Sequence, residues 1–269
     1  MLTEAYDVVE DKRVRMARVG SGPPLLLLHG YPDTLQIWSA LAPLLATRFD
    51  VIAFDWPGTG GSGAWSGGAT PFDLARRVVR LLDHWQLPRA TLVAHDMGGQ
   101  AALALAATKP SRIDRIVVMN SLVIPSYATS WEIDLLRRFR INRLLLRHFP
   151  RLVFHRALST SVAGLPAALR ADLWSRFRPR PARDFIVRMC AGYEGTLAKL
   201  ETLYDQMRVP VHIVWGEQDH HFPLAQGQRL HERIPGSTLD VIPGGGHWMV
   251  WDRAEEVAEV IAGRSHDAT

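Results

Sequence analysis

Two carboxylates and one imidazole in this sequence lie close to the ends of apolar runs, where side chains are available for chemistry. Asp96 lies between an apolar run and an Ala/Leu-rich helical pattern. Asp219 follows the run VPVHIVW, and His247 follows three glycines that can shape the backbone to present its ring. A lone Asp at such a place could simply cap the next helix, and a lone His could belong to a loop. Together, the three residues could instead be a nucleophile, a base and an orienting acid.

An aspartate in the role of nucleophile favours one kind of reaction. Its attack on an ester carbonyl would form a mixed anhydride, so it is a poor replacement for serine in ordinary esterase chemistry. At a saturated carbon it can open an epoxide or expel a halide, which leaves an ester whose carbonyl belongs to Asp96. His247 could then activate water against that carbonyl, while Asp219 orients the imidazole.

The elements that must position these residues alternate between strands and helices. The apolar runs are continuous, as in strands buried on both faces of a parallel sheet. Six segments are predicted as strands: Pro24 to His29, Val51 to Phe54, Ala90 to Ala94, Arg115 to Met119, Val211 to Trp215 and Thr238 to Ile242. Helical spacing marks five more: Ile37 to Thr47, Phe72 to Leu87, Met97 to Thr108, Pro223 to Ile234 and Ala254 to Ala262. This alternation predicts a mostly parallel, doubly wound α/β sheet, extended at one edge by an N-terminal hairpin that ends at Gly20.

Residues 122–205 interrupt the alternation, because they contain helical patterns but no convincing strand. The helical patterns run over Trp131 to Phe149, Pro166 to Phe177 and Pro181 to Tyr204. We therefore predict a helical cap, residues 122–205, inserted into an α/β core made of residues 1–121 and 206–269. Sheets of this type bind ligands at the carboxyl ends of their strands, so we expect the cap to cover the candidate catalytic residues there.

Five motifs occur in a characteristic order and spacing: LLLLHGYPD, FDWPGTGGS, AHDMGGQ, VWGEQDHHFP and GGGHWMVWD. In these motifs the chain resembles the α/β-hydrolase fold family over essentially its whole length. The resemblance implies that Asp96 lies at the nucleophile position of a sharp strand-to-helix turn, with Asp219 as the triad acid and His247 as the base. It also implies an oxyanion hole made by the backbone N–H groups of Tyr31 and Met97.

Within that family, the leaving group separates the branches that use an aspartate nucleophile. Haloalkane dehalogenases typically have Trp after the nucleophile and often Asn after His-Gly, where this chain has Met97 and Tyr31. Fluoroacetate dehalogenases typically carry two arginines in the nucleophile elbow, where this chain has Met97 and Gln100. They also have an acid where this chain has Asn120. The motif HGYPD resembles the HGxP motif of epoxide hydrolases, in which Pro32 would fix the turn, with a cis bond as one option. The resemblance therefore favours the epoxide hydrolases.

An epoxide leaves as an alkoxide and needs an acid, which epoxide hydrolases usually supply as a pair of cap tyrosines. Tyr193 lies about where these enzymes carry one of them, and His148 and Tyr127 are alternatives for the second, although each could simply pack inside the cap. Trp248, next to the base, is assigned to the substrate site. The resulting hypothesis is hydrolysis of an apolar epoxide to a diol through an Asp96 ester. A haloalkane or haloacid dehalogenase using the same ester, or a scaffold that binds or isomerises a ligand without one, are the alternatives.

Composition limits the remaining possibilities. Residues 122–205 hold 14 Lys and Arg against 7 Asp and Glu, a net charge of +7 within a chain of net charge +4. This basic region could meet an anionic surface, but no nucleic-acid-binding motif accompanies it, so the sequence favours a solvated helix face. No apolar run approaches the roughly 20 residues that span a bilayer, and the acidic N-terminus is unlike a signal peptide, so a cytoplasmic location is predicted.

No metal and no cofactor is predicted for the reaction. His220 and His221 beside Asp219 could suggest a metal site, but neighbouring side chains point apart and the chemistry needs none. The single cysteine, Cys190, is interpreted as a small buried hydrophobe. Water and an apolar small molecule are the expected reactants. A homodimer is one option for the oligomeric state.

Overall fold

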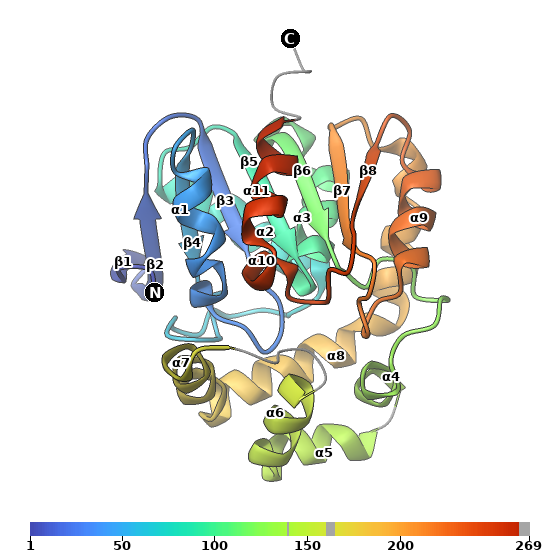
Figure 1. The fold of residues 1–269 in the computed structure, drawn as a ribbon. Coiled ribbons are helices and arrows are strands. Elements are labelled where there is room, and N and C mark those ends of the chain that lie inside the picture. The colour runs from blue at the N-terminus through green and yellow to red at the C-terminus, as the bar shows by residue number, and fades with distance from the viewer. Residues whose placement is uncertain (139, 160–164, 264–269) are drawn as a thin grey trace.

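The computed structural model describes residues 1–138, 140–159 and 165–263, and it is built around one sheet (Figure 1). The eight strands run in the order β1-β2-β4-β3-β5-β6-β7-β8. Their bounds are β1 Ala5–Val9, β2 Lys12–Val19, β3 Pro24–Leu28, β4 Asp50–Phe54, β5 Ala90–His95, β6 Ile113–Met119, β7 Val211–Gly216 and β8 Thr238–Ile242. All neighbours from β4 to β8 pair in parallel, and the β1–β2 hairpin joins antiparallel at the edge. The six predicted strands and the hairpin are confirmed.

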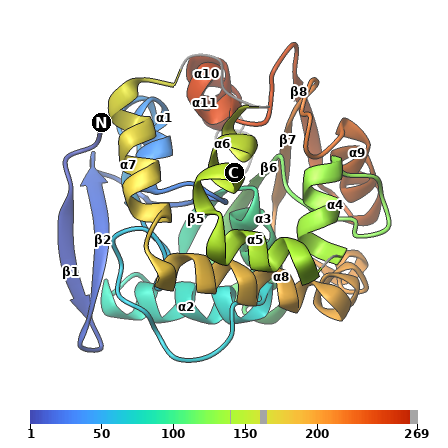
Figure 2. The ribbon, with the colours of Figure 1, turned by 90° about the horizontal axis from the view of Figure 1, so that it is seen from below.

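Helices cover both faces of the sheet, which explains why its central strands are apolar throughout. All six residues of β5 and of β7 are buried. The core helices are η1 Leu35–Ser39, α1 Leu41–Leu45, α2 Pro71–His84, α3 Met97–Thr108, η2 Pro110–Arg112, η3 Tyr204–Gln206, α9 Leu224–Arg233, α10 Met249–Asp252 and α11 Ala254–Gly263. Helices α1 and α11 contact each other on one face, and α2 and α3 contact each other on the opposite face (Figure 2).

Five helices between β6 and β7 lie together below the sheet in Figure 1. They are α4 Trp131–Arg138, α5 Arg140–His148, α6 Pro150–Ser159, α7 Ala167–Phe177 and α8 Arg180–Glu201. The predicted helix Trp131 to Phe149 is divided into α4 and α5 around residue 139, which lies outside the described residues. Helix α6 was not predicted; it begins at Pro150, because proline fits the first turn of a helix better than its interior.

A buried ion network ties one of these helices to the core. The Arg15 side chain is fully buried and donates to Asp55 at 3.0 Å and to Asp172 of α7 at 2.8 Å. Asp172 also accepts a hydrogen bond of 2.7 Å from the Thr34 hydroxyl. Because a buried arginine must keep its anionic partners, this network fixes α7 beside the loop that follows β3.

Candidate active site

Asp96 occupies a sharp turn between β5 and α3. Its backbone has φ 52° and ψ −120°, a conformation that a residue other than glycine adopts only when its surroundings impose it. A Cβ atom on Gly98 would lie 2.1 Å from the Leu28 carbonyl oxygen, so α3 can approach β3 only with glycine there. Asp96 also stands at the N-cap position of α3, but capping alone requires no left-handed backbone.

The two oxygens of Asp96 have different surroundings. Oδ1 accepts hydrogen bonds from the backbone N–H groups of Met97 and Tyr31, the second at 3.2 Å. Gly30 allows this approach, because a Cβ atom on it would lie 2.3 Å from Cβ of Asp96. The Tyr31–Pro32 peptide bond is cis. The two N–H groups expected for an oxyanion hole therefore converge on Oδ1, while Oδ2 lies on the side of His247.

His247 lies between the two carboxylates. Its Nδ1 is 2.9 Å from Oδ2 of Asp219, and its Nε2 is 3.6 Å from Oδ2 of Asp96. The other oxygen of Asp219 accepts backbone N–H groups of His221 and Phe222, at 2.7 and 3.0 Å. All three triad side chains are buried. The fold thus brings Asp96 together with two residues that lie more than 120 positions away in the sequence.

The charges of this triad are coupled. Burial opposes a charged imidazole, but Asp219 and Asp96 outweigh it and raise the pKa of His247 to about 10. Burial likewise opposes ionisation of Asp96, but His247 outweighs it and lowers the pKa of that carboxyl. The site without substrate therefore holds an imidazolium between two carboxylates.

Two residues that the sequence did not identify as positioning groups hold the loop of His247. The Asn120 side-chain amide donates to the carbonyls of Gly246 and His247 at 2.8 and 3.0 Å, and its oxygen accepts the Gly216 N–H. A ring nitrogen of His95 lies 2.8 Å from the His247 carbonyl. Asn120 directly follows β6, and that position at a strand end is the only sequence signal that could have identified it.

A narrow cavity opens at Asp96 beneath the cap. Tyr193 and Cys190 of α8 line it together with Arg137 of α4, and the remaining lining is mostly apolar. Arg137 donates to the Pro125 carbonyl at 2.9 Å and its side chain is mostly buried. Burial raises the pKa of Cys190 to about 12, so its thiol stays neutral. Arg137 was not predicted, since one arginine among many in the cap has no distinguishing local pattern.

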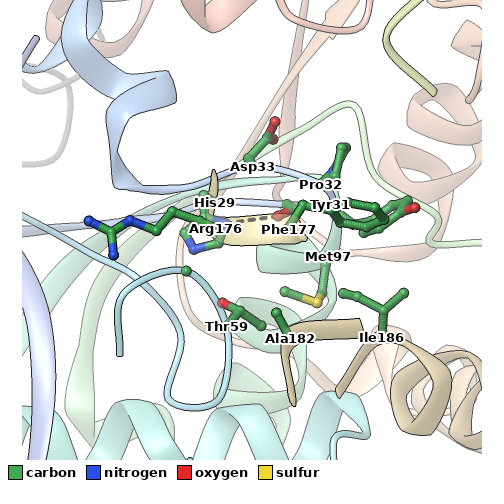
Figure 3. A pocket seen from close by; sticks show the side chains of 12 residues that line it. His29, Tyr31, Pro32, Asp33, Thr59, Met97, Arg176, Phe177, Ala182 and Ile186 are labelled. Atoms are coloured by element: carbon green, nitrogen blue, oxygen red, sulfur yellow. Dashed lines mark hydrogen bonds between the residues drawn. The ribbon is translucent and has the colours of Figure 1, made fainter. Parts of the chain in front are cut away.

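A second small pocket lies beside the oxyanion loop, which is defined as residues 29–33 after β3. Figure 3 shows the side chains of Tyr31 and Met97 there, facing Phe177, Ala182 and Ile186 of the cap. The ring centroids of Tyr31 and Phe177 are 5.9 Å apart. The two residues whose backbone N–H groups converge on Asp96 therefore contact the cap with their side chains.

The other candidate substrate residues do not line the cavity at Asp96. Trp248 is buried and donates from Nε1 to Asp33 at 3.0 Å, so it supports the loop after β3 from within the core. His148 is exposed at the end of α5, and Tyr127 is half-buried. Among the described residues at the cavity, only Tyr193 comes from the predicted set of cap residues.

Comparison with known proteins agrees with this geometry. Residues 23–254 match the model of a family described as the alpha/beta hydrolase fold. The chain belongs to that family. Its sequence is 26% identical to that of the uncharacterized hydrolase YugF of Bacillus subtilis, over 88% of this chain and 88% of that protein. It is 26% identical to haloalkane dehalogenase 2 of Mycobacterium bovis, over 94% and 91% of the two chains.

Solved structures support the same assignment of the hydrolase. An alpha/beta hydrolase fold protein from Burkholderia ambifaria superposes with a TM-score of 0.81 at 26% identity, covering 97% of each chain. The mostly parallel doubly wound sheet predicted from the sequence is thus confirmed as an α/β-hydrolase fold. Within the described part of this hydrolase, no helix combines the length and apolar character needed to cross a membrane.

Proposed function

We propose that this hydrolase opens an epoxide to a diol through a covalent ester on Asp96. The observation that carries the proposal is that Tyr193 lines the same cavity as Asp96, so a phenol and a carboxylate border one space. Burial, together with Cys190 and Asp96, raises the pKa of Tyr193 well above its usual value. The phenol therefore keeps its proton until an alkoxide develops beside it.

The first half-reaction forms the ester. Oδ2 of Asp96 attacks a ring carbon of the epoxide, the carbon–oxygen bond breaks, and the leaving oxygen takes the proton of Tyr193. Oδ1 stays on the two N–H groups of the oxyanion hole and becomes the carbonyl oxygen of the ester. The backbone of Tyr31 and Met97 therefore fixes which carboxylate oxygen attacks.

The second half-reaction hydrolyses the ester. His247 takes a proton from water, and the hydroxide oxygen attacks Cγ of Asp96. The negative charge that develops on Oδ1 is stabilised by the two N–H donors, a contribution of about 3 kcal/mol for one donor in related sites. Collapse releases the diol oxygen, which His247 protonates. The new Asp96 carboxylic acid then gives up its proton, which returns through solvent to the tyrosinate of Tyr193. One oxygen of water remains in the Asp96 carboxylate.

Release of a halide is the second candidate, and the similarity to haloalkane dehalogenase 2 favours it. A halide needs N–H donors rather than an acid. Among the described residues that line the cavity at Asp96, no tryptophan is present, and Met97 follows the nucleophile. The position of Tyr193 therefore favours opening of an epoxide over release of a halide. A scaffold that binds or isomerises a ligand would use neither reaction.

Mass spectrometry of two variants tests the proposal. The His247→Gln variant is expected to complete one alkylation and then to accumulate an ester whose added mass equals the whole epoxide. A haloalkane would add the alkyl group without the halogen. Asp96→Ala is the matched control and is expected to gain no mass. An unmodified His247→Gln protein, with every epoxide or haloalkane that the native enzyme consumes, would show that Asp96 is not the nucleophile.

A further inference from the structure

We propose that the outer face of the cap docks onto an anionic lipid surface. This basic apolar face consists of the exposed side chains of Trp131, Leu144, Phe149, Arg151 and Leu152 on α4, α5 and α6. Helices α5 and α6 form the end of the molecule furthest from the sheet in Figure 1 and lie in front in Figure 2. The inference goes beyond the proposed function, because it holds for either leaving group.

Large apolar side chains project from this face. Trp131, Leu144, Phe149 and Leu152 are 56%, 54%, 59% and 63% exposed. The other large exposed hydrophobic residues of the described chain lie in the α/β core, away from the cap. Isolated exposed apolar residues are ordinary, but a group on consecutive short helices is typical of a surface that meets an apolar phase.

The charge on these helices is mainly positive, although Glu132 and Asp134 lie beside Trp131 on α4. No Asp or Glu occurs between Leu135 and Ala171, whereas this stretch contains eight arginines. Arg151 is exposed and lies over the ring of Trp174, and Arg147 and Arg156 are paired with Asp184 and Glu132 on flanking helices. Arginines beside exposed leucine and phenylalanine match the headgroups and the acyl boundary of an anionic bilayer.

Other occupants fit this surface less well. A second copy of the chain would bring two arginine-rich faces together, and like charges disfavour that contact. A nucleic acid would use the arginines but gives no role to exposed aliphatic side chains such as Leu144 and Leu152. An anionic lipid surface uses both.

A mostly apolar cavity lies between this face and Tyr31. It has a volume of about 300 Å³, and its lining includes Trp131 and Leu152 of the basic apolar face. Tyr31, whose backbone N–H holds Asp96, lines the same cavity. A molecule dissolved in the bilayer could therefore reach Tyr31 through a cavity in which Glu132 and Arg156 are the charged members of a mostly apolar lining. The docking surface and the entrance for an apolar substrate are thus the same part of the cap.

Vesicle sedimentation with the full chain tests the docking. The protein is expected to sediment with vesicles of phosphatidylcholine and phosphatidylglycerol in equal amounts, and to stay in solution with phosphatidylcholine alone or at high salt. Phe149→Ser combined with Leu152→Ser is expected to weaken binding at least about tenfold. The matched control is Val8→Ser combined with Leu44→Ser, at two surface positions of the α/β domain, and this variant is expected to bind like the native chain.

A second measurement separates insertion from adsorption. Lipids brominated on their acyl chains are expected to quench tryptophan fluorescence, and Trp131→Phe is expected to remove most of that quenching. Three results would each overturn the proposal: failure to bind anionic vesicles, binding unchanged by Phe149→Ser with Leu152→Ser, or a dimer in solution that this double variant dissociates. None of these results depends on catalysis, so they are independent of the fate of the Asp96 ester.

Discussion

The Nε2 atom of His247 lies 3.6 Å from Oδ2 of Asp96, so the charge of each side chain depends on the other. An imidazolium cannot accept a proton from water, and the pKa of about 10 keeps His247 charged in the site without substrate. Formation of an ester removes the negative charge of Asp96, which is one of the groups that raise this pKa. Alkylation would therefore convert His247 into a base.

The two half-reactions should respond differently to pH. Alkylation is expected to be nearly constant across the neutral range, because the lowered pKa of Asp96 keeps the nucleophile ionised. The rate of ester hydrolysis is expected to rise with pH and to level off well below pH 10. In the ester, Asp96 is no longer negatively charged, so it no longer raises the pKa of His247. Rapid-quench mass spectrometry at a series of pH values measures both rates. Hydrolysis that still increases at pH 10 would contradict the coupling.

The free energy of unfolding should also depend on pH through His247. The pKa of His247 is raised on folding, so its contribution is complete below the unfolded value near 6.5 and is lost as pH rises through about 10. The difference in unfolding free energy between the native chain and His247→Gln is expected to fall between these pH values, by up to about 1.4 kcal/mol per pH unit. Urea titrations at pH 6, 8 and 10 measure it. A difference that grows with pH would have the wrong sign.

Removal of the Tyr193 hydroxyl should slow alkylation with an epoxide by about 100-fold, since general acid catalysis typically contributes that much. The Tyr193→Phe variant keeps the ring, so its thermal stability should stay near that of the native chain. Single-turnover mass spectrometry gives the rate. Tyr127→Phe is the matched control, because this half-buried tyrosine does not line the cavity at Asp96. Equal rates for both variants would remove Tyr193 from the reaction.

Substitution of Asn120 by alanine should impair hydrolysis more than alkylation. The variant loses both donors to the loop of His247 and leaves buried carbonyls without them, which costs about 1–3 kcal/mol of stability. The ring of His247 should then be held less firmly against the ester, so that the ester accumulates. Its lifetime in single-turnover experiments is the measurement. A lifetime equal to that of the native enzyme would show that Asn120 only stabilises the fold.

The glycine after Met97 should be irreplaceable for packing. Gly98→Ala places a methyl group against the Leu28 carbonyl and is expected to destabilise the protein by at least about 3 kcal/mol. Gly263→Ala, at a helix end where nothing lies within 4 Å of the added carbon, is the control and should change stability by less than about 1 kcal/mol. Chemical denaturation compares them. Similar values for both would show that the turn relaxes easily.

Residues with local signals were the ones that the sequence could identify. Asp96 is flanked by the small residues of its turn, and His247 follows three glycines, so short motifs locate them. Arg137 reaches the cavity because α4 crosses above Asp96, which depends on packing between distant segments. His148 was assigned to the substrate site from the family resemblance, yet it is exposed at the end of α5. Catalytic motifs are local properties of the chain, whereas the cap lining is a property of the assembled helices.

The bond between Asp172 and Arg15 makes the cap asymmetric. Helix α7 cannot leave the core without separating a buried guanidinium from one of its carboxylates, and such a separation is costly. Helices α5 and α6 make most of their contacts with neighbouring cap helices instead. Product is therefore expected to leave on the side of α5 and α6, while α7 stays in place. Exchange of substrate and diol then requires only half of the cap to move, and the oxyanion loop keeps its shape from one turnover to the next.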